Sequence, residues 1–445
     1  MFDLFKLHNQ KEDLKPNRYN VTSLICVKGV GLSAPVRKMV EDLTRIRAIR
    51  KIDVLREIGR EIGLADVTLK RKVNEANTEW LPLNFLETLF NKWVKYSRFS
   101  QKEYTKNKER IIRLFEWVKV NNPSSKPVKA VTVLTEDMCK ISGAHAADGC
   151  LHKAVYKNHT FHYIISICDG NIENIYLYSK WLSKVFGIKL SQPKQIGNAF
   201  YFAFRNKILF RYLNIILSFS PGRKSRIVNE PEIIAKSPFK FRKAFAKGVM
   251  MFDGSVTAAG NIRLGIKSQS LRNSIAEILQ KDNLKINQSD FKSGVFNLFT
   301  STRLGKSQLT KWLDYFETNT EKYFRIYELI HGFQKKPNDI EEALDVLQKV
   351  FPYGNKSKVS IADILESMLE LKRAYVWEIR DYLLRNKNLE SLSYTPIKFN
   401  MFLLEKLGKI IKSSQVPVKF EKSGHFCSLY ELNPVEEWKV PLRHN

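Results

Sequence analysis

Residues 141–150 read ISGAHAADGC, and residues 246–255 read AKGVMMFDGS. In each stretch a glycine is followed by four residues and then by Asp-Gly, and the two aspartates, Asp148 and Asp253, are 105 positions apart. Each motif is followed by two strand-like segments, an amphipathic helix, an alternating strand and another helix. A repeat with so long a period indicates a duplicated domain rather than a solenoid of short repeats.

The repeated pattern predicts an α+β fold for residues 136–333, with halves at about 136–235 and 236–333. Apolar residues alternate in the segments expected to be strands, and they recur at helical spacing in the segments between them. The order in each half is helix, two strands, helix, one or two strands, helix. The segments expected to carry strands are 151–168, 199–207, 255–267 and 294–306.

Gly143 and Gly248 occupy the same position in the two motifs. Two helices can approach closely at a glycine, because it has no Cβ. If these helices pack side by side, Asp148 and Asp253 meet at their C-terminal ends, where two carboxylates repel unless a cation lies between them. Oxygen ligands favour Mg²⁺, and this arrangement suits metal-assisted phosphodiester hydrolysis. One such motif alone would indicate only a helix C-cap.

The two motifs align without gaps with the motif of LAGLIDADG homing endonucleases, and the chain resembles the single-chain, two-motif form of that family. The resemblance covers residues 136–333. It implies a pseudo-symmetric αββαββα core whose saddle-like antiparallel sheets lie along DNA in the major groove. It also implies that Asp148 and Asp253 coordinate a divalent cation, that both DNA strands are cut, and that Lys267 acts near the scissile phosphate.

Besides His145, which puts a polar ring in a usually apolar helix, the sequence departs from the family pattern at two places. The family commonly has a lysine at the end of the second strand of each half, and the first half has Asp169 and Gly170 there. The residue before the acidic position is usually small, as Ala147 is, whereas Phe252 is bulky. Both aspartates are retained, so the prediction is still a metal-dependent DNA endonuclease.

The charge of the chain points to a polyanionic partner. Its 445 residues carry a formal net charge of +29 at pH 7, which favours nucleic acid before an anionic membrane. About half of the excess lies in residues 151–300, so salt-sensitive phosphate contacts are expected there. The candidate DNA-binding residues in and beside these strands are Lys153, Lys157, Arg205, Lys207, Arg263, Arg303 and Lys306.

The flanking regions are expected to be mainly helical. In residues 1–80, the segment 51–73 has a helix, a glycine turn and a basic second helix, which is a helix-turn-helix candidate or an ordinary helical hairpin. Residues 81–135 read as a helical segment and a linker. Residues 337–445 resemble a winged-helix domain, with a protein-contact module as the alternative. The candidate DNA-binding residues of these modules are Lys70, Arg71, Lys72, Lys398 and Lys422.

The cysteine content and hydropathy favour a soluble cytoplasmic protein. Five cysteines are an odd number and too few for a disulfide scaffold. No stretch of 18 apolar residues is present, and the first residues lack a signal-peptide core. The cluster Cys150, His152, His159, His162 and Cys168 matches no tight zinc pattern, so core or DNA-facing roles are preferred for it.

Together these features predict a free-standing, site-specific homing endonuclease that uses Mg²⁺ to make double-strand breaks. Double-stranded DNA is the expected partner, no membrane is involved, and the protein is expected to be a monomer. Two other functions would use the same features. One is a non-catalytic transcription regulator built on the same core, and the other is a maturase that binds intron RNA.

Overall fold

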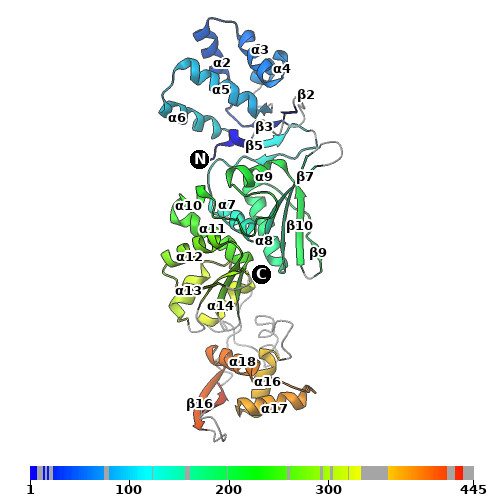
Figure 1. Ribbon diagram of the computed structural model, residues 1–445, viewed down its shortest axis with the longest axis vertical. Helices are drawn as coiled ribbons and strands as arrows, with labels where there is room; N and C mark the ends of the chain where they lie inside the picture. Colours follow the sequence, from blue (N-terminus) through cyan, green and yellow to red (C-terminus); the bar gives the residue numbers. More distant parts are fainter. Residues whose placement is uncertain are drawn as a thin grey trace. The chain divides into compact units, whose positions relative to one another are not determined.

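The computed structural model divides into two compact units, Met1–Phe252 and Asp253–Asn445, which are considered separately (Figure 1). Every strand pairing is antiparallel and helices separate the strands, which confirms the α+β class. Among the described residues, no helix is both long enough and apolar enough to cross a membrane. The described residues are 1–7, 14–15, 18–19, 24–74, 80–122, 124–155, 161–197, 199–257, 261–290, 294–300, 304–318, 320–331, 359–417 and 426–433.

The first unit begins with an N-terminal module built on a sheet of order β4-β3-β5-β6. The central strand β3 pairs with both β4 and β5, so one sheet joins residues on either side of position 80. The elements are η1 (Leu4–Leu7), β1 (Leu14–Lys15), β2 (Arg18–Tyr19), β3 (Ile25–Lys28), α2 (Ser33–Arg47), α3 (Lys51–Ile62), α4 (Asp66–Asn74), β4 (Leu81–Pro82), α5 (Leu83–Ser97), α6 (Gln101–Ile112), β5 (Trp117–Val120) and β6 (Val128–Lys129).

Two glycines shape the turn between α3 and α4. Gly63 ends α3 in the left-handed conformation, with φ of 70°, which glycine adopts without steric cost. Gly59 lies inside α3, and a Cβ there would be 2.4 Å from the carbonyl oxygen of Leu64. Both helices bury their apolar side against the module, with Ile58 and Leu69 fully buried. The helix, turn and second helix predicted in residues 51–73 are therefore present.

The rest of the first unit packs helices on a sheet of order β7-β8-β10-β9. Its first helix is capped by Thr135, whose hydroxyl accepts a hydrogen bond from the Met138 N–H at 3.2 Å. The elements are α7 (Glu136–Asp148), β7 (Gly149–Val155), β8 (Phe161–Asp169), α8 (Ile172–Phe186), β9 (Lys194–Ile196), β10 (Ala199–Arg205), α9 (Lys207–Arg211), η3 (Tyr212–Ile216), α10 (Glu232–Ala235) and α11 (Phe239–Phe252).

Buried hydrogen bonds hold the N-terminal module against this sheet. The Tyr212 hydroxyl accepts from the N–H of Val131 at 2.9 Å and donates to its carbonyl at 3.2 Å. The buried guanidinium of Arg211 donates to the carbonyl of Leu7 at 2.6 Å. Because an unpaired buried polar group is costly, these bonds fix the two parts as one unit.

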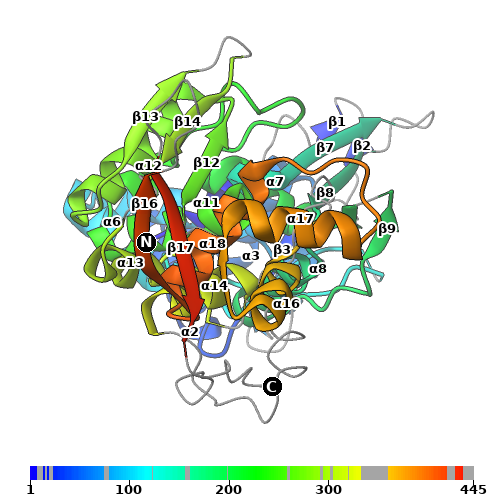
Figure 2. The same cartoon turned by 90° about the horizontal axis from the view of Figure 1, so that it is seen from below.

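The second unit contains another four-stranded sheet, with the order β11-β12-β14-β13 (Figure 2). In this sheet and in the sheet β7-β8-β10-β9, the first strand in sequence lies at one edge and the third lies at the other. Each sheet is preceded by a helix, interrupted by a helix and followed by a helix. The elements are β11 (Gly254–Val256), β12 (Ile262–Ile266), α12 (Gln269–Lys281), β13 (Asn287–Asp290), β14 (Phe296–Phe299), α13 (Lys306–Leu313) and α14 (Glu321–His331).

The C-terminal module has three helices and a small sheet of order β15-β17-β16. A capping box of Ser360 and Asp363 starts its first helix. Ile364, Ile379 and Leu404, one from each helix, form part of a buried core. The elements are α16 (Ile361–Leu371), β15 (Arg373–Tyr375), α17 (Val376–Asn386), α18 (Tyr394–Lys406), β16 (Ile410–Pro417) and β17 (Phe426–Leu432).

The apolar spacing of the sequence predicts helices over 81–120, 208–219 and 374–385, and each of the three segments differs in part from that prediction. Residues 117–120 are the strand β5 rather than the end of a helix, because they pair with β3. Residues 208–219, expected to be one core helix, form α9 and then the π-helical turn η3, in which the Leu217 N–H bonds to the Tyr212 carbonyl. Ala374 belongs to β15 rather than to the helix that follows, because it pairs with Tyr430.

The helices α7 and α11 pack with their backbones in contact. A Cβ on Gly143 would lie 2.1 Å from the carbonyl oxygen of Phe245, and a Cβ on Gly248 would lie 2.3 Å from that of Lys140. Phe245 and Lys140 are themselves 105 positions apart, so the contacts on the two sides are related by the sequence repeat. The close approach predicted from the two glycines is present.

Replacing Gly248 with alanine is expected to destabilise the first unit by about 1–3 kcal/mol, because the added methyl group clashes with backbone atoms. Gly305→Ala is the matched control, since Gly305 has φ of −66° and no atom within 4 Å of the new Cβ. Thermal unfolding followed by circular dichroism measures the difference. Equal melting temperatures for the two variants would contradict the backbone contact.

Candidate functional site

The helix α7 ends where the first strand of its sheet begins. Asp148 is its last residue, and Gly149 starts β7 opposite Ile167 of β8. This pairing brings Asp148 beside the end of β8, where Cys168 and Asp169 lie. Partial burial raises the pKa of the Cys168 thiol, and the negative charges of Asp148 and Asp169 raise it further. The two carboxylates therefore lie close enough to act on the same thiol.

Asn174, which is buried on α8, connects this end of the sheet to α11. Its side-chain amide donates to Oδ2 of Asp169 at 2.7 Å and to the carbonyl oxygen of Met251 at 2.9 Å. Met251 lies in the last turn of α11. The C-terminal ends of α7 and α11 are therefore on the same side, and the two helices run in the same direction (Figure 1). The chain leaves one helix at Asp148 and the other immediately before Asp253.

Lys224 reaches the C-terminal turn of α7 from the segment after η3. Its Nζ donates to the carbonyl oxygens of His145, Ala146 and Ala147, the last at 3.0 Å. A cation there stabilises the partly negative C-terminal end of a helix. Because Ala147 directly precedes Asp148, the same cation adds positive charge beside the first aspartate.

His145 is a buried, neutral member of α7. Neither ring nitrogen has a hydrogen-bond partner, and the ring packs edge-on against Phe219, with 5.0 Å between ring centres. Burial, and then the charge of Lys224, hold the pKa of His145 well below its ordinary value. Its role in α7 is therefore packing rather than proton transfer.

The first sheet has one face turned towards helices and one open face. Leu151, Ile165 and Phe202 are buried on the helix side, and the intervening residues form the open face. Among the described residues of the four strands, the lysines and arginines in register with this face are Arg205 of β10 and Lys194 of β9, which pairs with Tyr201. The residues of this face include Cys150, His152, His162, Ser166, Cys168, Tyr201, Ala203 and Arg205.

Two of the predicted DNA-binding lysines lie on the helix side of this sheet. Lys153 is opposite Tyr163 in the strand pair, and its Nζ is 5.9 Å from the centre of that ring. Lys207 begins α9, which corrects its expected place on a strand, and its Nζ is 5.5 Å from the same ring. Lys157 lies outside the described residues. Arg205 is thus the predicted residue that the structure places on the open face.

The second sheet presents hydrogen-bonding side chains on its open face. Arg263 is exposed on β12 and lies between Ser255 of β11 and Phe299 of β14. Its neighbours along the strand, Ile262 and Leu264, are buried on the other side. The described residues in register with this face are Ser255, Arg263, Gly265, Asn287, Ser289, Asn297 and Phe299.

Two further predicted residues, Lys267 and Lys306, lie next to the second sheet in sequence. Lys267 is exposed just beyond β12 and precedes Ser268, which caps α12. Lys306 begins α13, so it is not on a strand as expected, because its segment follows the sheet. Arg303 lies outside the described residues.

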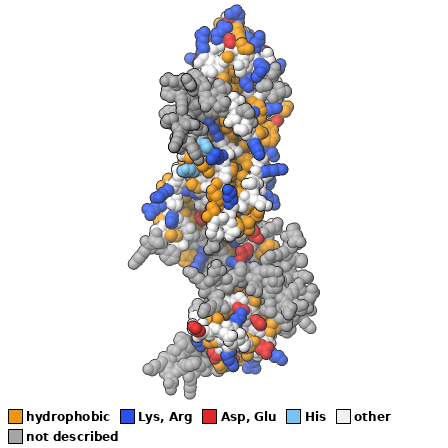
Figure 3. Space-filling model, turned by 90° about the vertical axis from the view of Figure 1, so that its right-hand side faces the viewer, with side chains coloured by type: hydrophobic (Ala, Val, Ile, Leu, Met, Phe, Trp, Pro, Cys, Tyr) orange, Lys and Arg blue, Asp and Glu red, His pale blue; other side chains and the backbone are white. Residues whose placement is uncertain are grey.

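The predicted residues of the flanking modules are mostly exposed. On α4, Lys70 and Arg71 point to solvent, whereas Lys72 is turned back and donates to the Trp80 carbonyl at 2.7 Å. Lys398 is exposed on α18, and Lys422 lies outside the described residues. Figure 3 shows lysine and arginine side chains, in blue, spread over the described surface of the N-terminal module rather than gathered in one patch.

The candidate metal ligands are the two aspartates. Within the described ranges, no three His, Cys, Asp or Glu side chains gather in a way that could hold a metal ion. Mg²⁺ typically takes one or two protein carboxylates and keeps several waters, so aspartate is a suitable ligand type, and Asp148 after α7 and Asp253 after α11 stay the predicted ligands. The described members of the cysteine and histidine cluster are spread along β7 and β8, and His159 lies outside the described residues.

Sequence reasoning missed Asn174 and Lys224. Both act through contacts between distant parts of the chain, 77 residues apart for Asn174 with Met251 and 77 for Lys224 with Ala147. No local motif marks either residue. The alternation of apolar residues predicts that one face of the sheet is open. It does not predict that the segment carrying Lys224 reaches the C-terminal end of α7.

No protein-family model matches the chain, and no curated protein matches it. Among solved structures, I-DmoI in complex with DNA and Mn is 20% identical, with a TM-score of 0.30, over 37% of this chain and 89% of that one. I-DmoI with DNA and Ca is 19% identical, with a TM-score of 0.32, over 40% and 87%. A structure of mesophilic variants of the homing endonuclease I-DmoI is 18% identical, with a TM-score of 0.31, over 40% of this chain and 94% of that one.

Acidification is expected to destabilise the folded chain through His145. Because the folded pKa is depressed, the unfolded chain takes up the proton first, and stability is lost as pH falls below about 6.5. At pH 5.5 this one residue should cost about 1–1.5 kcal/mol relative to pH 7.5. Denaturation of the wild type and of His145→Leu at both pH values isolates the effect. The same pH dependence in both proteins would contradict it.

Proposed function

We propose that the protein is a site-specific DNA endonuclease that uses Mg²⁺ to cut both strands of a duplex. The observation that carries the proposal is the Asn174 bridge, which sets the end of α11 beside the end of the first sheet. Two helices in backbone contact and running in the same direction support the proposal that Asp148 and Asp253, which follow in sequence at their C-terminal ends, would act together. Paired carboxylates repel in the absence of a cation, so this arrangement is costly unless it serves to bind one.

Asp148 and Asp253 would hold the ion. When bound, Mg²⁺ would act as a Lewis acid on the scissile phosphate and increase the acidity of a coordinated water. Asp169, beside Asp148, accepts hydrogen bonds from Asn171 N–H and from Asn174, which fix the position of its carboxylate. Lys267 would stabilise negative charge that develops on the phosphate.

Other residues of this chain compensate for the bulk of Phe252 and for the missing lysine of the first half, the two departures from the family pattern. Phe252 is buried and meets the ring of Tyr178 edge-on, with 6.3 Å between ring centres, so its bulk is absorbed by the core. Asp169 occupies the position of the missing lysine and fixes the start of α8 through Asn174. Lys224 supplies a cation beside Asp148 from another part of the chain.

The open faces of the two sheets would lie along the duplex and read its bases. Arg263, Asn287 and Asn297 have the side-chain types that pair with purine edges in the major groove. The first sheet offers Arg205 with serine, tyrosine and histidine side chains. The helices at 51–74 and the module at 359–433 would bind flanking DNA as helix-turn-helix and winged-helix modules, whose exposed cations Lys70, Arg71 and Lys398 would contact phosphates.

Asp148→Asn and Asp253→Asn are each expected to abolish cutting while leaving binding intact. Target sites would first be selected from a random duplex pool with the full chain in EDTA, and then placed in a plasmid and incubated with Mg²⁺. The rate should fall more than about a hundredfold, because even residues that only support metal ligands typically cost 10–100-fold.

Asp381→Asn is the matched control, since Asp381 is half exposed on α17, far from the motif in sequence. Tight sequence-specific binding by the wild type without any metal-dependent cutting would contradict the nuclease and favour a transcription regulator. Preferential binding of a folded intron RNA over every selected duplex would instead favour a maturase.

Arg263→Ala and Asn297→Ala are expected to weaken binding to the selected duplex by about 1–3 kcal/mol each and to relax specificity at one base position. Lys281→Ala removes one positive charge at the end of α12 and controls for net charge. Repeating the site selection with each variant measures specificity. An unchanged sequence preference in both variants would mean that this face does not read bases.

A further inference from the structure

A cavity of about 850 Å³ lies between the N-terminal module and the edge of the first sheet. One wall comes from β5 and the segment 124–128, and the other comes from the loop 187–191 and from β10 with the start of α9. Both walls belong to the first unit, and the Tyr212 and Arg211 hydrogen bonds hold them together. The cavity is therefore part of the folded unit rather than a chance gap between separate parts.

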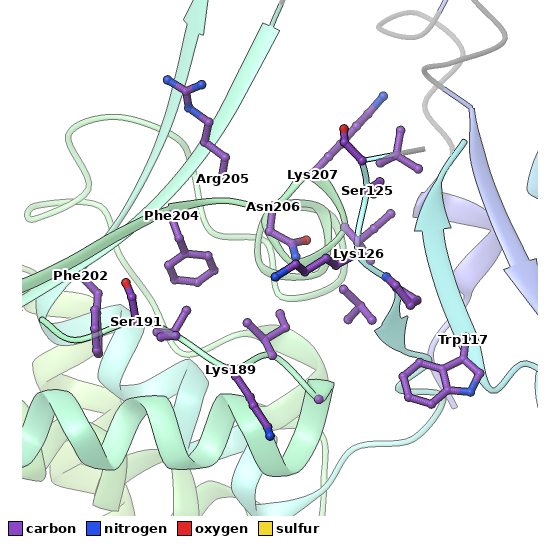
Figure 4. Close-up of a pocket in the computed structure, with 18 of the residues that line it drawn as sticks. Trp117, Ser125, Lys126, Lys189, Ser191, Phe202, Phe204, Arg205, Asn206 and Lys207 are labelled. Carbon is purple, nitrogen blue, oxygen red and sulfur yellow. The ribbon is translucent and has the colours of Figure 1, made fainter. Parts of the chain in front are cut away.

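The lining combines positive charge with aromatic rings. Lys126, Lys189 and Lys207 contribute amino groups, and the lining residues include neither aspartate nor glutamate. Figure 4 shows Phe204 entering from the β10 side and Lys126 from the opposite side, while Arg205 points away from the cavity. Such a lining would disfavour a cationic ligand and attract an anion that carries a flat ring.

Trp117 adds an aromatic surface that the fold does not require. It begins β5, yet 36% of its surface is exposed, whereas tryptophan is usually highly buried. Its backbone pairs with Lys28 and Lys129, so the strand holds the ring at the edge of the cavity. An exposed, well-anchored aromatic ring beside lysines is the combination on which unpaired bases stack.

The cavity is separate from the face proposed to bind the duplex. Phe202 and Phe204 belong to the helix side of β10, while Ala203 and Arg205 alternate with them on the open face. A nucleic-acid segment in the cavity would therefore leave the open face of the same sheet accessible. The bases of an intact duplex are stacked inside the helix, so a duplex could not fill this cavity without base flipping.

We propose that this cavity binds a single-stranded nucleic-acid segment, with one unpaired base on Trp117, another on Phe204, and its phosphates on Lys126 and Lys189. Its volume is within the range of ligand pockets. The hydroxyl groups of Ser125 and Ser191, which also line it, offer adaptable hydrogen bonds to base edges or sugars. The proposal does not depend on cleavage, because it concerns a different surface and an unpaired strand.

The test is fluorescence anisotropy with the full chain and fluorescein-labelled oligonucleotides of eight uridines or eight thymidines. Trp117→Ala and Lys126→Glu should each weaken binding by at least about fivefold, as expected for the loss of one stacked base or one phosphate contact. Trp377→Ala, which removes another exposed tryptophan, 43% exposed on α17, and Lys102→Glu on α6 are the matched controls. Both controls should bind like the wild type.

Competition separates the two surfaces. A selected duplex should not displace the oligonucleotide, and the pocket variants should bind that duplex with unchanged affinity. Any of three results would overturn the proposal: no binding of either oligonucleotide, equal loss in the control variants, or displacement by the duplex at its own binding constant. Binding of uridine monophosphate as tightly as the oligonucleotide would also overturn it, because the cavity would then be a site for free nucleotides.

Discussion

The backbone contact between α7 and α11 is the constraint on which the rest of this structure depends. Two helices can approach this closely only where neither has a side chain, and Gly143 and Gly248 provide that absence at equivalent positions. The two contacts are equivalent under the 105-residue offset. Each glycine meets the carbonyl oxygen of the residue three positions before the other glycine, Phe245 for Gly143 and Lys140 for Gly248. Any symmetry between the halves of the molecule begins at this contact.

Each of these two helices leads into a four-stranded sheet, and each sheet has one open face. Each helix passes directly into the edge strand of a four-stranded sheet with the same order, so each open face begins two residues after a motif aspartate, at Cys150 and at Ser255. The alternation of strands then decides which side chains can reach a partner. Because apolar residues fill the helix side, the side chains between them, such as Arg263 and Arg205, are left on the open face.

Much of this could be predicted from the sequence, because the repeat and its glycines are local signals. What could not be predicted depends on register or on distant contacts. Lys153 and Lys207 were expected beside DNA, but both lie over the ring of Tyr163. The strand register turns Lys153 to the helix side of the sheet, and Lys207 is the first residue of α9. Lys224 and Asn174 act on residues 77 positions away. The pairing of β5 with β3 likewise overrides a helical pattern at Trp117.

The net charge of +29 is interpreted more precisely once the positions of the lysine and arginine side chains are known. The open face of the first sheet carries few charges among its described residues, and that of the second is mainly amide, hydroxyl and arginine. Phosphate contacts position a protein on nucleic acid, whereas base contacts provide specificity. Under the proposed function, the lysines around the cavity, on α4 and on α18 would position the protein on phosphates, and the sparse polar surfaces of the sheets would read bases.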